Sequence, residues 1–206
     1  MLRFDRSIYL ASRSPRRREL LAQLGIPFHL LMFRGTELDE AVKPGEAPRE
    51  YVQRIASEKA QSGWSRMTQR RLPRSPVLAA DTTVALGERI FGKPAHHREA
   101  AEILGALSGK RHEVLTAVAV KQEEQLETAL SVSEVQFRVL SPQEIRDYVA
   151  TGECDDKAGA YGIQGRAATF VQEIRGSHSG IVGLPLFETA QLLASLGPLR
   201  DRRNPD

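Results

Sequence analysis

An apolar run in the first half of the chain contains an acidic residue. Residues 77–86 read VLAADTTVAL, so Asp81 and two threonines interrupt side chains that are otherwise apolar. Such a run predicts a buried strand, because short apolar segments bounded by turn residues are typical of sheet interiors. A carboxylate inside it needs polar or cationic partners, since burying an unpaired charge is strongly unfavourable. Asp81 is therefore a candidate functional carboxylate, with the capping of a turn as the alternative.

A second stretch, near the N-terminus, places cations where a helix begins. Residues 8–11 predict a short strand, and leucines then recur at helical spacing until Gly25. Ser14 suits the N-cap and Pro15 the first helical position. Arginines occupy residues 16–18, in the first turn, where the helix dipole disfavours cations unless an anion binds beside them. With the serine hydroxyls and backbone N–H groups, they predict either an anion site or a solvated basic turn.

Composition argues against several classes of protein. The single cysteine, Cys154, leaves no disulfide within the chain and favours a cytoplasmic location. Residues 1–12 lack the apolar core of a signal peptide, and no apolar run approaches the length of a membrane span, so no membrane partner is expected. The formal net charge of +3 is too small to indicate nucleic acid, and phosphorylated small molecules fit equally well.

Strand and helix patterns are mixed through the rest of the chain. Strands are predicted over residues 28–33, 77–86, 112–120, 126–138 and 169–174. Helices are predicted over residues 48–62, 97–107, 142–151 and 185–196. Loops are predicted over residues 34–47, 66–76, 153–165 and 176–183. This mixture predicts an α/β or α+β protein with a mixed sheet.

Four other patterns do not indicate sites. Residues 87–93 match the first part of a phosphate-binding P-loop, but Pro94 follows where a metal-binding hydroxyl is required. The adjacent histidines at 96–97 have no second pair at zinc spacing, so solvated histidines are expected. The basic segment 66–76 lacks interleaved aromatic residues, which favours an exposed connector over a nucleic-acid surface. Cys154 has no recognisable base and is expected to be inert.

The polar residues that remain in unusual settings combine cations with carboxylates. They are Ser12, Arg16, Arg17, Glu40, Lys59, Asp81, Lys93, Lys157 and Gln164. Arginine and lysine hold phosphates, whereas carboxylates hold a divalent metal or orient water. This set is typical of metal-assisted phosphoryl chemistry, which proceeds mostly by positioning and charge neutralisation.

Six blocks, in order along nearly the whole chain, resemble the Maf family of nucleoside triphosphate pyrophosphatases. They are LASRSPRRRELL, AADTTVAL, GKP, LSGKRHEVLTAVAV, TGECDDKAGAYGIQG and GLPLFET. The resemblance implies an α/β fold with a long mixed central sheet flanked by helices, akin to the inosine-triphosphate pyrophosphatase superfamily. It implies one domain over residues 1–206, undivided or with two lobes around a central cleft, and a homodimer.

The resemblance also implies an activity. The family hydrolyses nucleoside triphosphates between the α- and β-phosphates and releases the monophosphate and pyrophosphate, with a divalent metal cation such as Mg²⁺ or Mn²⁺. The block AGAYGIQG resembles the branch that acts on dTTP and UTP. Arg13, Cys154, His178 and Gly180 depart from the usual family pattern, and the last two bear on substrate preference.

Phosphate-binding roles follow from the same resemblance. Ser12, Arg16 and Arg17 would bind the triphosphate, while Lys59 and Lys93 would neutralise its charge. Lys93 would thereby take part in catalysis as well as in binding. On spacing alone, Lys59 also fits a solvated lysine on a helix face.

Carboxylate and base-reading roles are implied in the same way. Asp81 would be the general base or a metal-orienting carboxylate, and Glu40 the second catalytic and metal-binding carboxylate, with Asp39 as its fallback. Gln164 would read the pyrimidine base, because an amide offers the donor and acceptor that an imide edge requires. Lys157 would touch phosphate or only hold its loop. Arg13 and Arg18 are expected at the surface.

Three alternatives to this activity stay open at the level of sequence. The first is a protein that senses a nucleotide or binds a cell-division partner without turnover. The second is a hydrolase that releases orthophosphate from a monoester or a terminal phosphate. The third is nucleic-acid binding through residues 66–74, which the modest net charge does not favour.

Overall fold

The computed structural model describes residues 7–32 and 38–196. Its strands are β1 (Ile8–Leu10), β2 (Phe28–Leu30), β3 (Val77–Leu86), β4 (Arg89–Phe91), β5 (Arg111–Gln122), β6 (Gln125–Phe137) and β7 (Val171–Arg175). Its α-helices are α1 (Pro15–Gln23), α2 (Pro48–Gln69), α3 (His97–Leu107), α4 (Pro142–Val149), α5 (His178–Val182) and α6 (Leu186–Ser195). Two 3₁₀ segments, Ala158–Ala160 and Arg166–Phe170, lie between α4 and β7.

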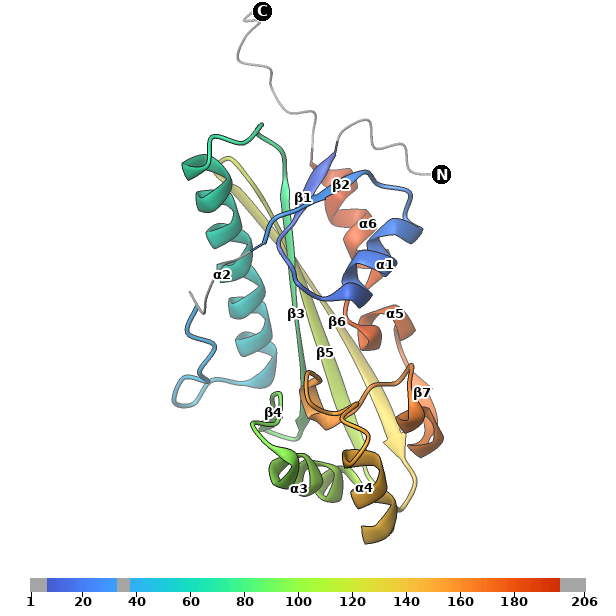
Figure 1. The fold of residues 1–206 in the computed structure, drawn as a ribbon. Coiled ribbons are helices and arrows are strands. Elements are labelled where there is room, and N and C mark those ends of the chain that lie inside the picture. The colour runs from blue at the N-terminus through green and yellow to red at the C-terminus, as the bar shows by residue number, and fades with distance from the viewer. Residues whose placement is uncertain (1–6, 33–37, 197–206) are drawn as a thin grey trace, which may run out of the picture.

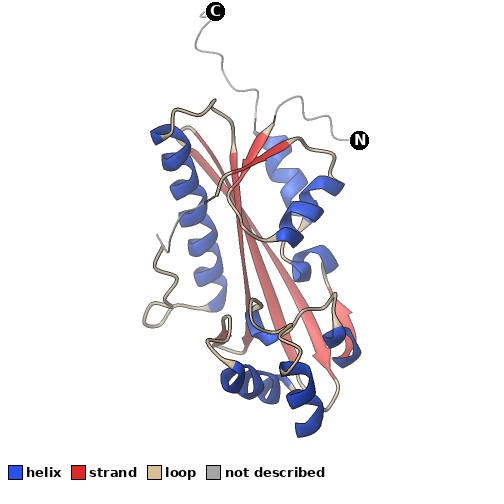
Figure 2. Ribbon diagram, in the orientation of Figure 1, coloured by secondary structure: helices blue, strands red, loops and turns tan. Residues whose placement is uncertain are grey.

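The described strands form a seven-stranded sheet, and it is mixed, as the sequence predicts. Its order is β2-β1-β3-β5-β6-β7, with β4 paired to β3 beside this path. β1 runs parallel to β2 and β3, whereas β3, β5, β6 and β7 follow one another antiparallel. The three long strands β3, β5 and β6 run through the length of the molecule, with helices on both sides (Figures 1 and 2). The predicted α/β fold with a long mixed sheet flanked by helices is confirmed.

Alternate residues of β3 belong to two different parts of the core. Val77 and Ala79 pack in the apolar cluster that includes the inner face of α2, whereas Leu78 and Ala80 pack with residues of α1 and α6. This is the alternation expected of a strand buried on both faces. Gly63 lets α2 approach closely, because a Cβ at this position would lie 2.7 Å from Val77 Cγ1.

Several predicted boundaries are wrong. Helix α2 continues to Gln69, where residues 66–76 were expected to be a loop, because Met67 is fully buried in the core below α2. The expected loop 176–183 contains the short helix α5, whose N-cap is Ser177. Strand β2 ends at Leu30, earlier than the strand predicted over residues 28–33. The loop predicted over residues 34–47 is described only from residue 38.

Strand β7 begins later than predicted, at Val171, because a 3₁₀ segment occupies the residues before it. Strands β5 and β6 extend slightly closer to their turn than predicted, pairing as far as Gln122 and Gln125. Within the described ranges, no helix is long and apolar enough to cross a membrane.

An aromatic cluster joins the far end of the sheet to the glycine-rich loop 153–165. His112 Nε2 lies 2.9 Å from the Tyr161 hydroxyl, and both rings contact Phe137 edge-on. Burial lowers the pKa of His112 to about 4, so the imidazole is neutral in the folded protein at neutral pH. This buried pair holds Tyr161, and with it one end of the loop, against β5.

The His112 imidazole makes stability depend on pH. Between about pH 6.5 and pH 4 the unfolded chain binds a proton at His112 that the folded chain does not, so the free energy of unfolding falls as the pH is lowered. The loss attributable to His112 is roughly 3 kcal/mol at most across this window. Urea denaturation at several pH values should show a shallower decline in His112→Gln. Equal slopes in the two proteins would contradict the assignment.

Candidate active site

A cleft opens where β3 changes its neighbour on one side. β1 pairs only with Val77 and Leu78, and β4 only with residues 84–86, so the middle of β3 has no ladder partner on that side among the described residues. A cleft of about 970 Å³ lies there, lined by the β1–α1 turn, α2, β3 and the glycine-rich loop. Because this stretch is an edge, side chains from both faces of β3 reach the same cavity.

Lys59 joins the two candidate carboxylates. By alternation Asp81 lies on the same face of β3 as Val77 and Ala79, which is the face that α2 covers. Lys59, on α2, places its Nζ 2.7 Å from Asp81 Oδ1 and 2.9 Å from Glu40 Oε1. Asp81 is only 8 % exposed and has the cationic partner that its burial requires.

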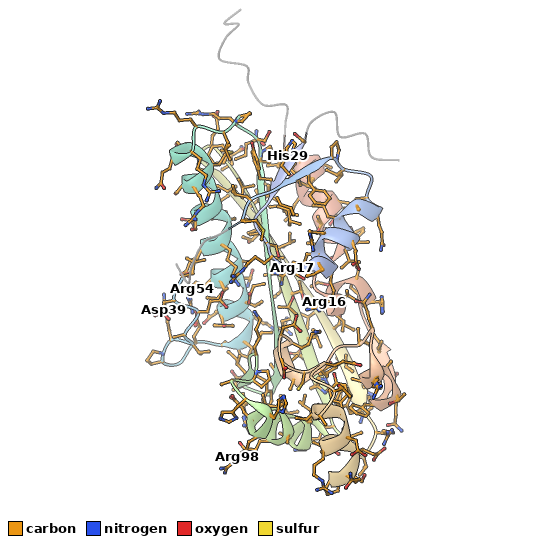
Figure 3. The ribbon with its side chains drawn as sticks, in the orientation of Figure 1. Arg16, Arg17, His29, Asp39, Arg54 and Arg98 are labelled. Carbon is orange, nitrogen blue, oxygen red and sulfur yellow. The ribbon has the colours of Figure 1, made fainter. Side chains whose placement is uncertain are left out.

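Glu40, and not Asp39, faces this cleft. Burial alone would raise the pKa of Glu40, but the Lys59 ammonium, with Lys93 and Arg17 beyond it, brings that pKa below its ordinary value. Asp39 is exposed on an adjoining surface, where its Oδ1 accepts a hydrogen bond from the Ala41 N–H (labelled in Figure 3). Of the two candidate carboxylates in this loop, Glu40 lines the cleft that contains Asp81.

Arg17 reaches the cleft from the opposite face of β3. Its Nε donates to the Gly183 carbonyl at 2.8 Å, and its Nη2 donates to Thr82 Oγ1 at 3.2 Å. Thr82 Oγ1 lies 2.9 Å from Thr116 Oγ1, which in turn donates to the Gly180 carbonyl. Burial lowers the pKa of Arg17, and the nearby Asp81 opposes this change. The guanidinium is thus fixed before any ligand binds.

Sequence reasoning did not identify Thr82 and Gly183 as site residues. The available signal for Thr82 was its position beside Asp81, but neighbours in a strand point to opposite faces, which argued against a shared site. Nothing local connects Gly183 to Arg17, because their contact joins positions 166 residues apart. Only the packing of α5 against α1 brings them together.

The turn between β1 and α1 has the predicted cap. Ser14 is the N-cap of α1, its Oγ accepts from the Arg17 N–H, and Pro15 occupies the first turn. Ser12 is buried, and its Oγ accepts from the Ser14 N–H at 3.1 Å. Arg13 and Arg18 are exposed, as predicted.

Arg16 lies on the other side of this turn, facing the glycine-rich loop. Arg16 Nη2 is 3.6 Å from Asp156 Oδ2, and Asp156 also pairs with Lys157. The two basic side chains therefore share a single carboxylate at the rim of the cleft. Figure 3 labels Arg16 and Arg17 where they project from α1.

The far rim is formed by two segments that hydrogen bond to each other. The Gly159 N–H donates to the Gly92 carbonyl at 3.0 Å, which places Lys93 beside the glycine-rich loop. Gly159 has a φ of +69°, and a Cβ there would lie 2.6 Å from Val84 Cγ2, so only glycine fits. Lys93 and Gln164 are both exposed and both line the cleft.

The two carboxylates fit a divalent cation that also binds a phosphorylated ligand. In the described part of the chain, no group of three or more His, Cys, Asp and Glu side chains is placed to hold a metal. Asp81 and Glu40 nevertheless converge on one point, as their shared contact with Lys59 shows. Mg²⁺ is commonly bound by one or two carboxylates plus substrate phosphates, and these two oxygen donors match that pattern.

The histidines and the cysteine for which the sequence predicts no site lie outside the group formed by Asp81, Glu40 and Lys59. His96 does more than predicted, because its Nδ1 accepts from the Glu99 N–H and caps α3. His97 pairs with Asp155 at 3.3 Å. Cys154 is buried, and burial with the adjacent carboxyl of Asp155 raises the pKa of its thiol, which agrees with the predicted inert cysteine.

Cations and paired carboxylates at the edge of a mixed sheet define an α/β protein with a site for a phosphorylated ligand. The sequence model of the Maf-like protein family matches residues 7–196, and the chain belongs to this family. Among its curated relatives, the dTTP/UTP pyrophosphatase of Aromatoleum aromaticum is 58 % identical over 196 residues, covering 92 % of this chain and 95 % of that protein. The dTTP/UTP pyrophosphatase of Nitrosomonas europaea is 53 % identical over 195 residues, covering 92 % and 94 %.

Among solved structures, the Staphylococcus aureus Ham1 protein aligns with a TM-score of 0.42 and 12 % identity, covering 64 % of this chain and 72 % of that chain.

Removing the Lys59 ammonium should change the ionisation of Glu40. In Lys59→Met the main group that lowers the pKa of Glu40 is lost, so this pKa should rise, although Lys93 and Arg17 still oppose the effect of burial. NMR titration of the Glu40 carboxyl in the ligand-free protein measures this. The exposed Lys110→Met serves as the control. If Glu40 titrates at the same pH in Lys59→Met and in the unmodified protein, Lys59 is not its dominant partner.

Proposed function

We propose that this protein hydrolyses nucleoside triphosphates between the α- and β-phosphates, preferring dTTP and UTP, and releases the monophosphate and pyrophosphate. The observation that carries the proposal is the contact of Lys59 with both Asp81 and Glu40 inside a cleft bordered by cations. The names of relatives that are 50–58 % identical support the substrate class and the type of reaction.

The triphosphate binds through groups on both sides of the cleft. Arg16 and Arg17 contact it from α1, whose free N–H groups and dipole favour an anion. Lys93 contacts it from the opposite rim, and Ser12 from the turn below. Because Arg17 is already held by Gly183 and Thr82, it loses little side-chain freedom on binding.

Asp81 acts as the general base. It accepts a proton from a water molecule as the water oxygen attacks the α-phosphorus, and the bond from that phosphorus to the bridging oxygen breaks. Pyrophosphate leaves with the electron pair of that bond, and Lys59 and Lys93 neutralise the charge that develops on it. General-base catalysis of this kind and fixed cations at the leaving group are the two main contributions of the protein.

Glu40 and Asp81 are the residues that would hold a divalent cation, Mg²⁺ or Mn²⁺. When bound, the cation supplies charge neutralisation and orientation of the phosphate oxygens. The Lys59 ammonium keeps the two carboxylates close together in its absence.

Gln164 reads the base. It lies at the rim of the cleft, on the glycine-rich loop, and the cleft volume of about 970 Å³ is enough for a nucleotide. A carboxamide can donate to and accept from the imide edge of uracil or thymine. The single-domain boundaries, the homodimer, the cytoplasmic location and the absence of a nucleic-acid partner remain predictions from the sequence and the family resemblance.

Asp81→Asn should lose most of the pyrophosphatase activity, because an amide cannot accept the proton. A reduction of kcat by about 10²- to 10⁴-fold is expected. The assay uses dTTP, UTP, CTP, GTP and ITP with Mg²⁺ or Mn²⁺ and separates products by chromatography. Asp147→Asn, at an exposed position of α4, is the matched control and should retain full activity.

Three results would contradict the proposal. Full activity in Asp81→Asn would remove its role as base. Release of orthophosphate would indicate a terminal-phosphate hydrolase. Tight nucleotide binding by the unmodified protein without turnover would indicate a sensor.

Gln164→Ala should relax the choice of base. The preference for dTTP and UTP, measured as the ratio of their kcat/KM to those of other nucleotides, should fall by about tenfold, since the imide edge of the base loses a hydrogen-bond partner. Gln143→Ala, on the exposed surface of α4, should leave that ratio unchanged. An equal slowing of all nucleotides in Gln164→Ala would exclude base reading.

A further inference from the structure

We infer that Arg54 and Tyr51 are positioning residues, which hold the loop of residues 38–47 against α2 and thereby place Glu40 in the cleft. The inference rests on the proposed function in that Glu40 acts there as one of the two carboxylates. Neither Arg54 nor Tyr51 lines the cleft itself, so each acts through the loop.

Arg54 binds the end of the loop next to α2. Its Nε lies 2.5 Å from Glu46 Oε1 and its Nη2 lies 2.8 Å from Glu46 Oε2. This bidentate ion pair fixes the orientation of the Glu46 carboxylate as well as its distance from the guanidinium. The same Nη2 donates to the Ala41 carbonyl at 3.0 Å. The side chains of Arg54 and Glu46 are 16 % and 8 % exposed, which reduces the screening that weakens surface pairs.

Tyr51 holds the residue immediately before Ala41. Its hydroxyl donates to the Glu40 carbonyl at 3.0 Å, and its ring is buried against the core below α2. The Arg54 guanidinium lies over this ring, 5.6 Å from its centroid. Two successive carbonyls of the loop, those of Glu40 and Ala41, are therefore bonded to side chains of the same helix.

These contacts come from one face of α2. Residues 51, 54 and 58 are spaced at i, i+3 and i+7, so they project toward the loop, and Glu58 also contacts Arg54 at 3.4 Å. Lys59 follows on the next position and reaches the Glu40 carboxylate. One helix thus holds both the backbone of Glu40 and its side chain.

The loop needs this support because Glu40 has little of its own. Residues 38–46 contain no helix or strand, and the Glu40 side chain is 47 % exposed. A single ion pair at that exposure contributes little to order. Holding the neighbouring carbonyls fixes where the Glu40 Cα lies, and small displacements of a group in an active site reduce rate strongly.

The experiment combines three variants with Glu40→Gln. Arg54→Gln, Tyr51→Phe and Glu46→Gln each remove part of the contacts between α2 and the loop of residues 38–47. Glu46→Gln changes a residue of the loop, and the other two change residues of α2. Each should lower kcat for dTTP by roughly 10- to 100-fold with little change in KM. Added to Glu40→Gln, each should cause no further loss, because the residue that it positions is already absent.

Hydrogen exchange gives a second readout that does not depend on activity. In the ligand-free protein, amides of residues 39–47 should exchange faster in Arg54→Gln and Glu46→Gln than in the unmodified protein, but not faster in Glu40→Gln. Arg98→Gln is the control, since Arg98 forms an exposed pair with Glu102 on α3 far from the loop (Figure 3), and it should change neither readout.

Two outcomes would overturn the inference. One is a loss of kcat in these three variants that adds fully to the loss in Glu40→Gln, which would show that they act on another part of the site. The other is unchanged exchange of the loop in Arg54→Gln. Failure of the proposed function is a separate result, in which the unmodified protein releases no pyrophosphate from dTTP. The exchange measurement would then still test whether Arg54 and Glu46 hold the loop against α2. Tyr51→Phe, which removes one oxygen atom only, keeps the test available if Arg54→Gln does not fold.

Discussion

The arrangement of this protein depends on a carboxylate placed in the middle of a buried strand. Asp81 is tolerated there because Lys59 of α2 meets it at 2.7 Å, and Gly63 lets the same helix lie close to the sheet. The same Lys59 ammonium forms a second ion pair, with Glu40 Oε1 at 2.9 Å. A requirement of folding, the pairing of a buried charge, thus assembles two carboxylates and a cation where phosphate chemistry needs them.

The edge of the sheet determines which groups can join this centre. Between its pairing with β1 and with β4, the middle of β3 is open on one side in the described structure, so Asp81 and Thr82 reach one cleft although they point to opposite faces. Asp81 meets α2, and Thr82 meets Arg17 of α1. The site is therefore a consequence of strand order as much as of the residues within it.

Local patterns in the sequence predicted most of the elements but not the contacts between them. The apolar run around Asp81 and the cap at Ser14 and Pro15 predicted a strand and a helix start that the structure confirms. The end of α2 was missed because residues 66–69 are mostly polar, whereas in the structure they continue the helix and Met67 packs in the core. The bond from Arg17 to Gly183 joins residues from opposite ends of the chain, and no local signal encodes it.

The most direct test of the central claim follows the oxygen atom of the attacking water. If Asp81 directs water to the α-phosphorus, hydrolysis of dTTP in ¹⁸O-labelled water should place the label in the monophosphate and leave the pyrophosphate unlabelled. Mass spectrometry of the separated products distinguishes the two positions. Label in the pyrophosphate would show attack at the β-phosphorus, and labelled orthophosphate would show attack at the terminal one. Either result would contradict the role assigned here to the Asp81–Lys59–Glu40 centre.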